Sequence, residues 1–195
     1  GGRFDPGMLY FSPQIWCSDN TDPIERLSIQ YGTSMCYPVS TVGAHVSACG
    51  RTGYETKGNV AMAGTFGYEL DPIKLNDEEL ETVKKQVADY HKYYDVIHSG
   101  DLYRLIAPME DGHHCAWGYV AQDKSEALFT FVTVLYNCNS TFFARLKGLD
   151  PDKYYRDSWT GEVHSGALLM NAGLSFKNAP RKDGTSFTVY VEEVK

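Results

Sequence analysis

Hydrophobic residues in the first half of the chain follow two alternating patterns. Short runs rich in β-branched and aromatic residues predict three strands, at residues 9–16, 37–48 and 59–71. Residues 22–32 instead place Ile24, Leu27 and Tyr31 three or four positions apart, which predicts a short helix. A Gly-rich loop is expected at residues 49–58. Strands that alternate with helical patterns indicate parallel βα units rather than hairpins.

The helical pattern is clearest at residues 76–100. One apolar stripe is formed there by residues three or four positions apart, namely Leu80, Val83, Val87, Tyr90 and Tyr94. Asn76 followed by Glu79 is typical of a capping box, and Gly100 is placed to end the helix. The sequence therefore predicts one long amphipathic helix in this region.

After residue 100 the pattern changes to short apolar segments separated by turn sequences. These segments predict strands at residues 115–122, 126–135, 140–149, 166–174 and 186–194. In the last segment Phe187, Val189 and Val191 alternate with polar or amphipathic neighbours. Turn sequences such as Asp183-Gly184 lie between the segments. This pattern predicts an antiparallel β-sandwich of about six to eight strands.

The change of pattern divides the chain into an α/β part, residues 1–100, and an all-β part, residues 101–195. The chain opens on Gly1 and Gly2 without an initiator Met, as though it had been cut from inside a loop. We therefore expect it to be the C-terminal piece of a longer protein.

Composition narrows the possible functions. With 43% hydrophobic and 22% charged residues, the chain suits a globular protein with a sizeable core. A net charge of −7 argues against a nucleic-acid partner. There is neither a signal-like start nor an apolar run long enough for a membrane span. The five scattered cysteines favour free thiols in a reducing compartment, so a cytoplasmic protein is expected.

Two carboxylates lie three residues apart in the stretch "WCSDNTDPIER", residues 16–26. Asp22 precedes Pro23 and has Glu25 three positions later, which predicts a helix N-cap. Asp19 falls between the end of a predicted strand and the start of that helix. In a parallel βα unit this is the position where barrel enzymes place catalytic groups. The alternative is an ordinary loop aspartate that binds its own turn.

Long segments of the chain resemble the glycoside hydrolase family 36 α-galactosidases. The segments "GGRFDPGMLYFSPQIWCSDNTDPIERLSIQYGTSMCYPVSTVGAHVSA" and "GNVAMAGTFGYELD" are similar to the later part of the family's catalytic barrel. The resemblance continues through "LYRL" and "LKGLDPDKYYRDSWTGEVHSGALLMNAGL" and so covers nearly the whole chain. It implies the last βα units of a (β/α)8 barrel followed by an antiparallel β-sandwich domain.

The resemblance also implies a function. It assigns Asp19 as the general acid/base of a retaining α-galactosidase that removes terminal α-linked galactose from oligosaccharides such as raffinose and melibiose, without a cofactor. In this family the nucleophile is an Asp in a Lys-Trp-Asp strand that the chain does not contain. The piece alone is therefore expected to be inactive, and the full-length enzyme is expected to be a homo-oligomer. Gly1 and Gly2 resemble the end of a substrate-binding loop.

Other interpretations stay open at this stage. Trp16 offers an apolar face to a sugar or packs in the core, and Cys17 lines the pocket or is a small buried hydrophobe. The segment 47–58 is shorter than the corresponding family loop, which leaves its role at the pocket undecided. No metal site is expected at the adjacent His113 and His114. Alternative functions are a non-catalytic carbohydrate-binding or structural β-domain, and an α-N-acetylgalactosaminidase on the same scaffold.

Overall fold

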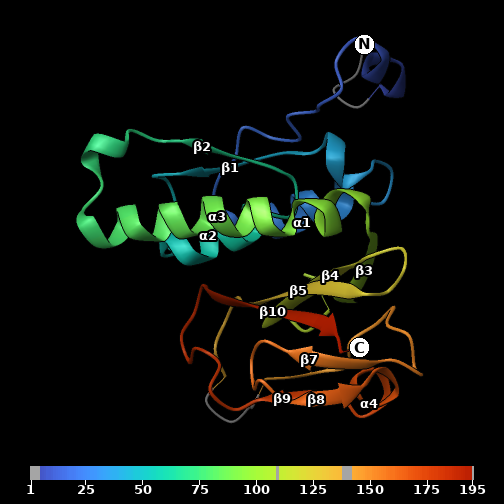
Figure 1. The fold of residues 1–195 in the computed structure, drawn as a ribbon. Helices are drawn as coiled ribbons and strands as arrows, with labels where there is room; N and C mark the ends of the chain where they lie inside the picture. Colours follow the sequence, from blue (N-terminus) through green and yellow to red (C-terminus); the bar gives the residue numbers. More distant parts are fainter. Residues whose placement is uncertain (1–4, 109, 138–141, 195) are drawn as a thin grey trace. The chain divides into compact units, whose positions relative to one another are not determined.

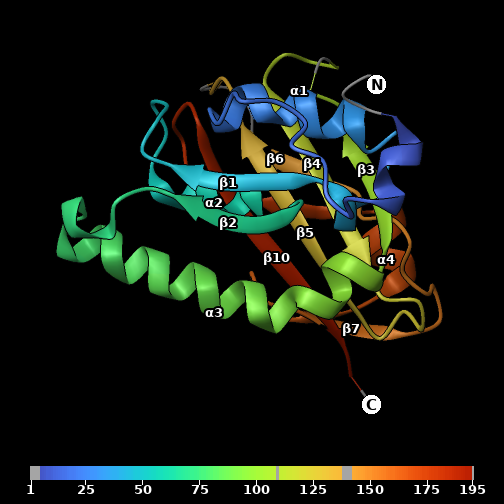
Figure 2. The same ribbon diagram turned by 90° about the horizontal axis from the view of Figure 1, so that it is seen from above.

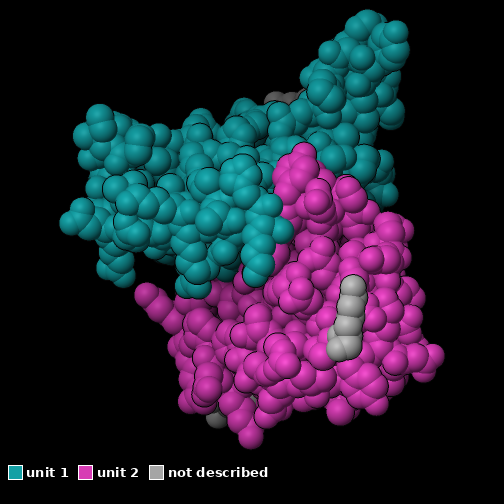
Figure 3. Space-filling view, in the orientation of Figure 1, with its two compact units in different colours: residues 1–92 teal, residues 93–195 magenta. Residues whose placement is uncertain are grey.

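The computed structural model describes residues 5–108, 110–137 and 142–194 (Figures 1 and 2). The chain forms two compact units, residues 1–92 and 93–195, which Figure 3 colours separately. Each unit is described by itself below. Within the described ranges, no helix is both long enough and apolar enough to cross a membrane.

The first unit is built on short parallel strand segments connected by helices. Its elements in chain order are η1 (Pro6–Tyr10), α1 (Pro23–Thr33), η2 (Val39–Thr41), β1 (Gly43–Ser47), α2 (Tyr54–Ala61), β2 (Thr65–Glu69), η3 (Pro72–Lys74) and α3 (Asp77–Ser99), which continues into the second unit. β1 and β2 pair in parallel from Gly43 opposite Thr65 onward. A single parallel bridge joins Ile15 to Val42, so a third segment runs in the same direction. The predicted parallel βα arrangement is confirmed for these segments.

Helix α1 forms as predicted, and its buried face includes residues other than the three that predicted it. The face contains Pro23, Arg26, Leu27 and Gln30, whereas Ile24 and Tyr31 are only half-buried. Two polar residues, Arg26 and Gln30, thus occupy the buried face. Their side chains find backbone partners inside the unit, as described below.

Helix α3 also forms as predicted and starts with the expected capping box. The backbone N–H of Asn76 donates to Glu79 Oε2 at 2.9 Å, and the backbone N–H of Glu79 donates to Asn76 Oδ1 at 2.9 Å. Two members of the predicted stripe, Val87 and Tyr94, are exposed. The centre of the buried face is taken by Gln86, whose amide donates to the carbonyl of Tyr54 at 2.6 Å.

Two further segments of the first unit differ from expectation. The predicted strand at residues 9–16 is mostly wrong, because Asp5 accepts from the backbone N–H of Gly7 at 2.9 Å and starts the turn η1. The predicted loop at residues 49–58 becomes helix α2 from Tyr54 onward. Gly58 lies inside this helix. A side chain is excluded at this position because a Cβ would overlap the amide of Gln86. This glycine therefore serves close packing rather than a turn.

The second unit is dominated by an antiparallel sheet. Its elements are β3 (Asp101–Ile106), β4 (His114–Val120), β5 (Glu126–Thr133), β6 (Phe142–Ala144), β7 (Tyr154–Asp157), β8 (Val163–Ser165), α4 (Gly166–Asn171), β9 (Leu174–Phe176) and β10 (Thr185–Glu193). Six strands follow the order β3-β4-β5-β10-β7-β8, and β6 pairs with β9 in a small separate sheet. The order of the central strands within the sheet is visible in Figure 1, where red β10 lies between β5 and β7.

An aromatic core joins the two sheets of the second unit. The rings of Phe131 and Phe187, on β5 and β10, stack with centroids 5.0 Å apart. Phe142 on β6 and Phe176 on β9 belong to the same buried cluster, as does Leu169 of α4. The predicted alternation along β10 is confirmed, because Phe187, Val189 and Val191 are all buried. The strand predicted at residues 166–174 was wrong in its first part, where the Ser165 side chain caps helix α4.

We expect the buried hydroxyl of Tyr155 to stabilise this unit. It accepts from the backbone N–H of Asp150 at 3.0 Å and donates to the carbonyl of Lys124 at 2.8 Å. Replacing Tyr155 by Phe leaves both backbone groups without this partner, so the free energy of unfolding should fall by about 1–3 kcal/mol. The neighbouring Tyr154 is 59% exposed, and Tyr154→Phe is the matched control. Urea unfolding measures both variants, and equal stability of the two would contradict this role.

Candidate active site

Asp19 lies in the loop that connects the Ile15 segment to helix α1. Its side chain is exposed and makes no hydrogen bond or ion pair with any residue in the described ranges. Because Ile15 pairs in parallel with Val42, this loop is at the carboxyl end of its strand segment. The geometry agrees with the predicted position of a strand-end carboxylate. It leaves the carboxyl group of Asp19 available to a molecule outside the described chain.

The loop around Asp19 is held by its own polar side chains. The backbone N–H of Asn20 donates to Ser18 Oγ at 3.1 Å, and the backbone N–H of Asp22 donates to Asn20 Oδ1 at 2.9 Å. Thr21 Oγ1 accepts from Ser47 Oγ, at the end of β1, at 2.8 Å. The carboxyl ends of two neighbouring parallel segments are thereby joined beside Asp19.

Asp22 is occupied by helix capping. Its Oδ1 accepts from the backbone N–H groups of Ile24 and Glu25 at 2.9 and 3.3 Å. A Cβ on Gly50 would approach Asp22 Oδ2 to 2.6 Å, so the loop after β1 packs closely against this carboxylate. The predicted N-cap is confirmed. The backbone N–H of Asp22 donates to Asn20 Oδ1 and not to Glu25, so the reciprocal bond of a capping box is not formed.

Arg26 is a residue of this region that sequence reasoning did not single out. It is 4% exposed and lies on the buried face of α1. Nη1 donates to the carbonyl of Ser18 at 3.2 Å, and Nη2 donates to the carbonyl of Gly43 at 2.5 Å. Burial lowers the pKa of Arg26 because the charged form loses hydration.

Trp16 stands directly before the same loop. Its ring packs edge-on against His45 of β1 with centroids 4.2 Å apart, and a Cβ on Gly43 would lie 3.1 Å from Trp16 Cε3. The residue nevertheless stays 39% exposed. Burial lowers the pKa of His45. The tryptophan thus combines packing on β1 with a ring surface that is open to solvent.

The other sequence candidates fall into two groups. Gly1 and Gly2 lie outside the described residues. Cys17 is buried, and its thiol donates to the carbonyl of Ile15 at 3.7 Å. Its burial agrees with the interpretation of Cys17 as a small hydrophobic residue. The cysteines of the described ranges, Cys17, Cys36, Cys49 and Cys115, are free thiols.

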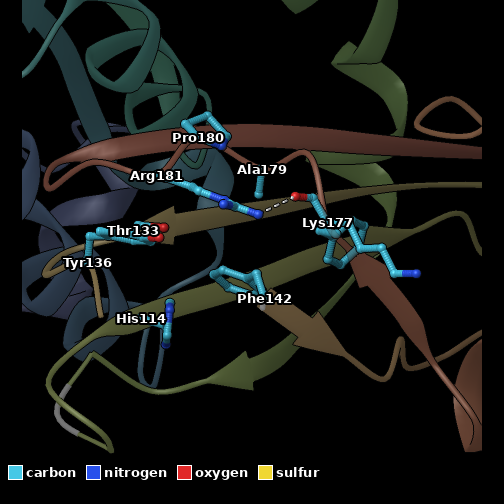
Figure 4. A pocket seen from close by; sticks show the side chains of 9 residues that line it. His114, Thr133, Tyr136, Phe142, Lys177, Ala179, Pro180 and Arg181 are labelled. Atoms are coloured by element: carbon cyan, nitrogen blue, oxygen red, sulfur yellow. Dashed lines mark hydrogen bonds between the residues drawn. The ribbon is translucent and has the colours of Figure 1, made fainter. Parts of the chain in front are cut away.

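A hollow in the second unit has a different chemistry (Figure 4). It is lined by His114, Thr133, Tyr136, Phe142, Phe176, Lys177, Ala179, Pro180 and Arg181. No carboxylate is among these lining residues, so the hollow offers no acid/base pair for glycoside hydrolysis. His114 Nδ1 is 2.9 Å from Asp111 Oδ2, outside the hollow. The described residues contain no cluster of three or more side chains suited to a metal ion.

Comparison with known families gives matches over both parts of the chain. Residues 1–100 match the family described as melibiase, and residues 114–191 match the glycosyl hydrolase family 36 C-terminal domain. Among curated proteins, the chain is 50% identical over 181 residues to the bifunctional α-galactosidase/sucrose kinase AgaSK of Mediterraneibacter gnavus, covering 89% of the chain and 19% of that protein. It is 49% identical over 182 residues to α-galactosidase AgaA of Geobacillus stearothermophilus, covering 90% of the chain and 25% of that protein. The chain therefore spans about a fifth to a quarter of these relatives.

Solved structures match over the full chain. The galactosidase domain of AgaSK superposes with a TM-score of 0.94 at 46% identity, covering 100% of this chain and 28% of that one. A variant of the Geobacillus stearothermophilus enzyme AgaA in complex with raffinose gives a TM-score of 0.93 at 44% identity, with the same coverage of both chains. A second AgaA variant was solved with stachyose, again at a TM-score of 0.93.

The helix-capping role of Asp22 can be tested by substitution. Asp22→Asn keeps a side-chain oxygen for the N-cap, so we expect little change in stability, whereas Asp22→Ala should lower the free energy of unfolding by about 1 kcal/mol. Thermal unfolding of the two variants beside the parent chain provides the measurement. Equal melting temperatures for the Asn and Ala variants would show that the cap contributes nothing.

Proposed function

The chain belongs to the melibiase family, and from this premise we propose that the whole protein is a retaining α-galactosidase with Asp19 as its general acid/base. Its substrates are oligosaccharides that end in α-linked galactose, such as raffinose and melibiose. The proposal draws on relatives named α-galactosidases and on the AgaA variants solved with raffinose and stachyose. The observation that carries it is the contrast between Asp22, which caps α1, and Asp19, whose carboxyl group has no partner among the described residues.

We propose the corresponding fold for the whole protein. Residues 1–100 supply the last βα units of a (β/α)8 barrel, and residues 101–195 form a β-sandwich domain. The parallel pairing of Ile15, β1 and β2 supports the first assignment. The shared core of the two antiparallel sheets supports the second.

The chemistry needs two carboxyl groups about 5–5.5 Å apart. In the first step a nucleophilic carboxylate attacks the anomeric carbon while the Asp19 carboxyl donates its proton to the departing glycosidic oxygen. This step leaves a β-linked galactosyl-enzyme. In the second step the Asp19 carboxylate takes a proton from water as the water attacks, and galactose leaves with its α configuration retained. The nucleophile belongs to a Lys-Trp-Asp strand outside this chain, and no cofactor takes part.

Several residues complete the proposed site. The exposed part of the Trp16 ring faces the sugar, since it lies immediately before the loop that bears Asp19. Gly1 and Gly2, which lie outside the described residues, are proposed to contribute to substrate binding. The full-length enzyme works as a homo-oligomer in the cytoplasm, a location that the free thiols of the described cysteines support.

The role of Asp19 is tested by replacing it with Ala in the full-length protein. Hydrolysis of raffinose should fall by about 10²–10⁴-fold, because the departing sugar oxygen needs a proton. An aryl α-galactoside with a good leaving group should lose far less in the glycosylation step. Added azide should attack the β-linked galactosyl-enzyme and yield α-galactosyl azide, since azide needs no general base. Formation of β-galactosyl azide instead would identify Asp19 as the nucleophile and overturn the assignment.

The isolated chain of 195 residues is expected to hydrolyse no α-galactoside. Without the nucleophile no galactosyl-enzyme forms, so Asp19 has no reaction to assist. An assay of the purified chain with an aryl α-galactoside, beside the full-length protein as the active control, measures this. Turnover by the isolated chain would place both carboxylates of the mechanism within it.

A further inference from the structure

Arg26 connects the Asp19 loop to the neighbouring strand through its buried side chain. One end of the guanidinium donates to the carbonyl of Ser18, the residue directly before Asp19, at 3.2 Å. The other end donates to the carbonyl of Gly43, the first residue of β1, at 2.5 Å. A single planar group therefore joins two adjacent parallel segments at their backbones.

The orientation of this guanidinium is itself determined by its surroundings. Its Nε donates to Gln30 Oε1 at 3.1 Å, and Gln30 Nε2 donates to the carbonyl of Val60 in α2 at 3.0 Å. Arginine presents five N–H donors in a rigid plane, whereas lysine presents one compact ammonium on a flexible stem. Lysine at position 26 cannot hold both carbonyl oxygens in the same geometry.

The partners of Arg26 are neutral. No carboxylate in the described ranges pairs with it, and its hydrogen bonds go to two carbonyl groups and one side-chain amide. A buried charge opposes folding unless its hydrogen bonds compensate for lost hydration, and an apolar residue of similar volume is often at least as stabilising. An apolar residue could therefore fill the space of the Arg26 side chain without placing a charge in the interior. The hydrogen-bonding geometry is what distinguishes Arg26 from such a residue.

We infer that Arg26 is the positioning residue of Asp19, an inference that rests on the proposed role of Asp19 as acid/base. The peptide bond between Ser18 and Asp19 is planar, so holding the Ser18 oxygen also fixes the backbone nitrogen of Asp19. The Asp19 side chain has no partner of its own among the described residues, and its place therefore follows from this backbone. Displacement by about 1 Å can lower a catalytic rate about 100-fold.

The experiment compares Arg26→Lys and Arg26→Met in the full-length protein. Arg156→Lys is the matched control, because Arg156 also donates to a carbonyl, that of Gly161 at 2.8 Å, but is exposed on β7. For each variant, kcat and KM are measured with raffinose and with an aryl α-galactoside whose leaving group needs no proton. Thermal unfolding identifies the folded variants, and a crystal structure of Arg26→Lys locates the Ser18–Asp19 peptide.

A positioning role predicts a specific set of results. In folded Arg26→Lys, kcat/KM for raffinose should fall at least about tenfold, while kcat/KM for the activated aryl substrate, which reports the glycosylation step alone, should fall about threefold or less. Arg26→Met should lose more on raffinose than Arg26→Lys, and Arg156→Lys should match the parent on both substrates. In the crystal structure Asp19 should be displaced relative to β1.

Equal losses in kcat/KM on both substrates, or no loss in a folded variant, would overturn the role of Arg26 while leaving the proposed function intact. If the parent protein hydrolysed neither substrate, the proposed function would fail instead. The crystal structure of Arg26→Lys would then decide separately, since an unmoved Ser18–Asp19 peptide overturns the positioning role and a displaced one supports it.

Discussion

Parallel pairing of three short segments determines where every group of the candidate site lies. Ile15 donates its N–H to the carbonyl of Thr41 at 2.6 Å, and Gly43 donates to the carbonyl of Ile15 at 2.8 Å. Thr65 donates to the carbonyl of Val42 at 2.7 Å, which brings β2 to the same sheet. Since parallel strands end at a common edge, the loops that follow Ile15 and β1 must meet. The contact between Thr21 and Ser47 is a direct result.

Buried polar side chains hold the elements of the first unit in place. One apolar cluster of this unit has only small or medium-sized buried members, namely Ala44, Val46 and Ala61. Arg26 and Gln30 on α1, and Gln86 on α3, bond to backbone carbonyls of neighbouring elements. Such bonds are directional, whereas apolar contacts tolerate sliding, so they define how far each helix lies from its strand.

Features that depend on a few consecutive residues could be predicted from the sequence. The N-cap at Asp22 and the reciprocal bonds of Asn76 and Glu79 are of this kind, because each involves groups no more than three positions apart. Asp19 could be singled out for the same reason, as the strand-end carboxylate without a capping task. Its catalytic role stays a prediction that the geometry alone does not test.

Features that depend on distant partners could not be predicted in this way. The buried face of α3 is centred on Gln86 because Tyr54 and Tyr68 bond to its amide, and both tyrosines are distant in sequence. Gly58 looked like a loop residue, yet it lies in a helix to make room for that amide. Arg26 was overlooked likewise, since only the fold brings Ser18 and Gly43 to its two ends.

The different surroundings of the two aspartates follow from the chain path between them. Asp22 faces the free N–H groups of α1, which stabilise a carboxylate and hold it in one place. Asp19 is three residues earlier, at a bend in the loop between the Ile15 segment and α1, and no backbone donor faces its side chain among the described residues. A carboxyl group that must both donate and accept a proton needs an oxygen that is free to approach the substrate, whereas two backbone N–H groups already occupy Oδ1 of Asp22. The residue without a cap is for this reason the better placed of the two for acid/base chemistry.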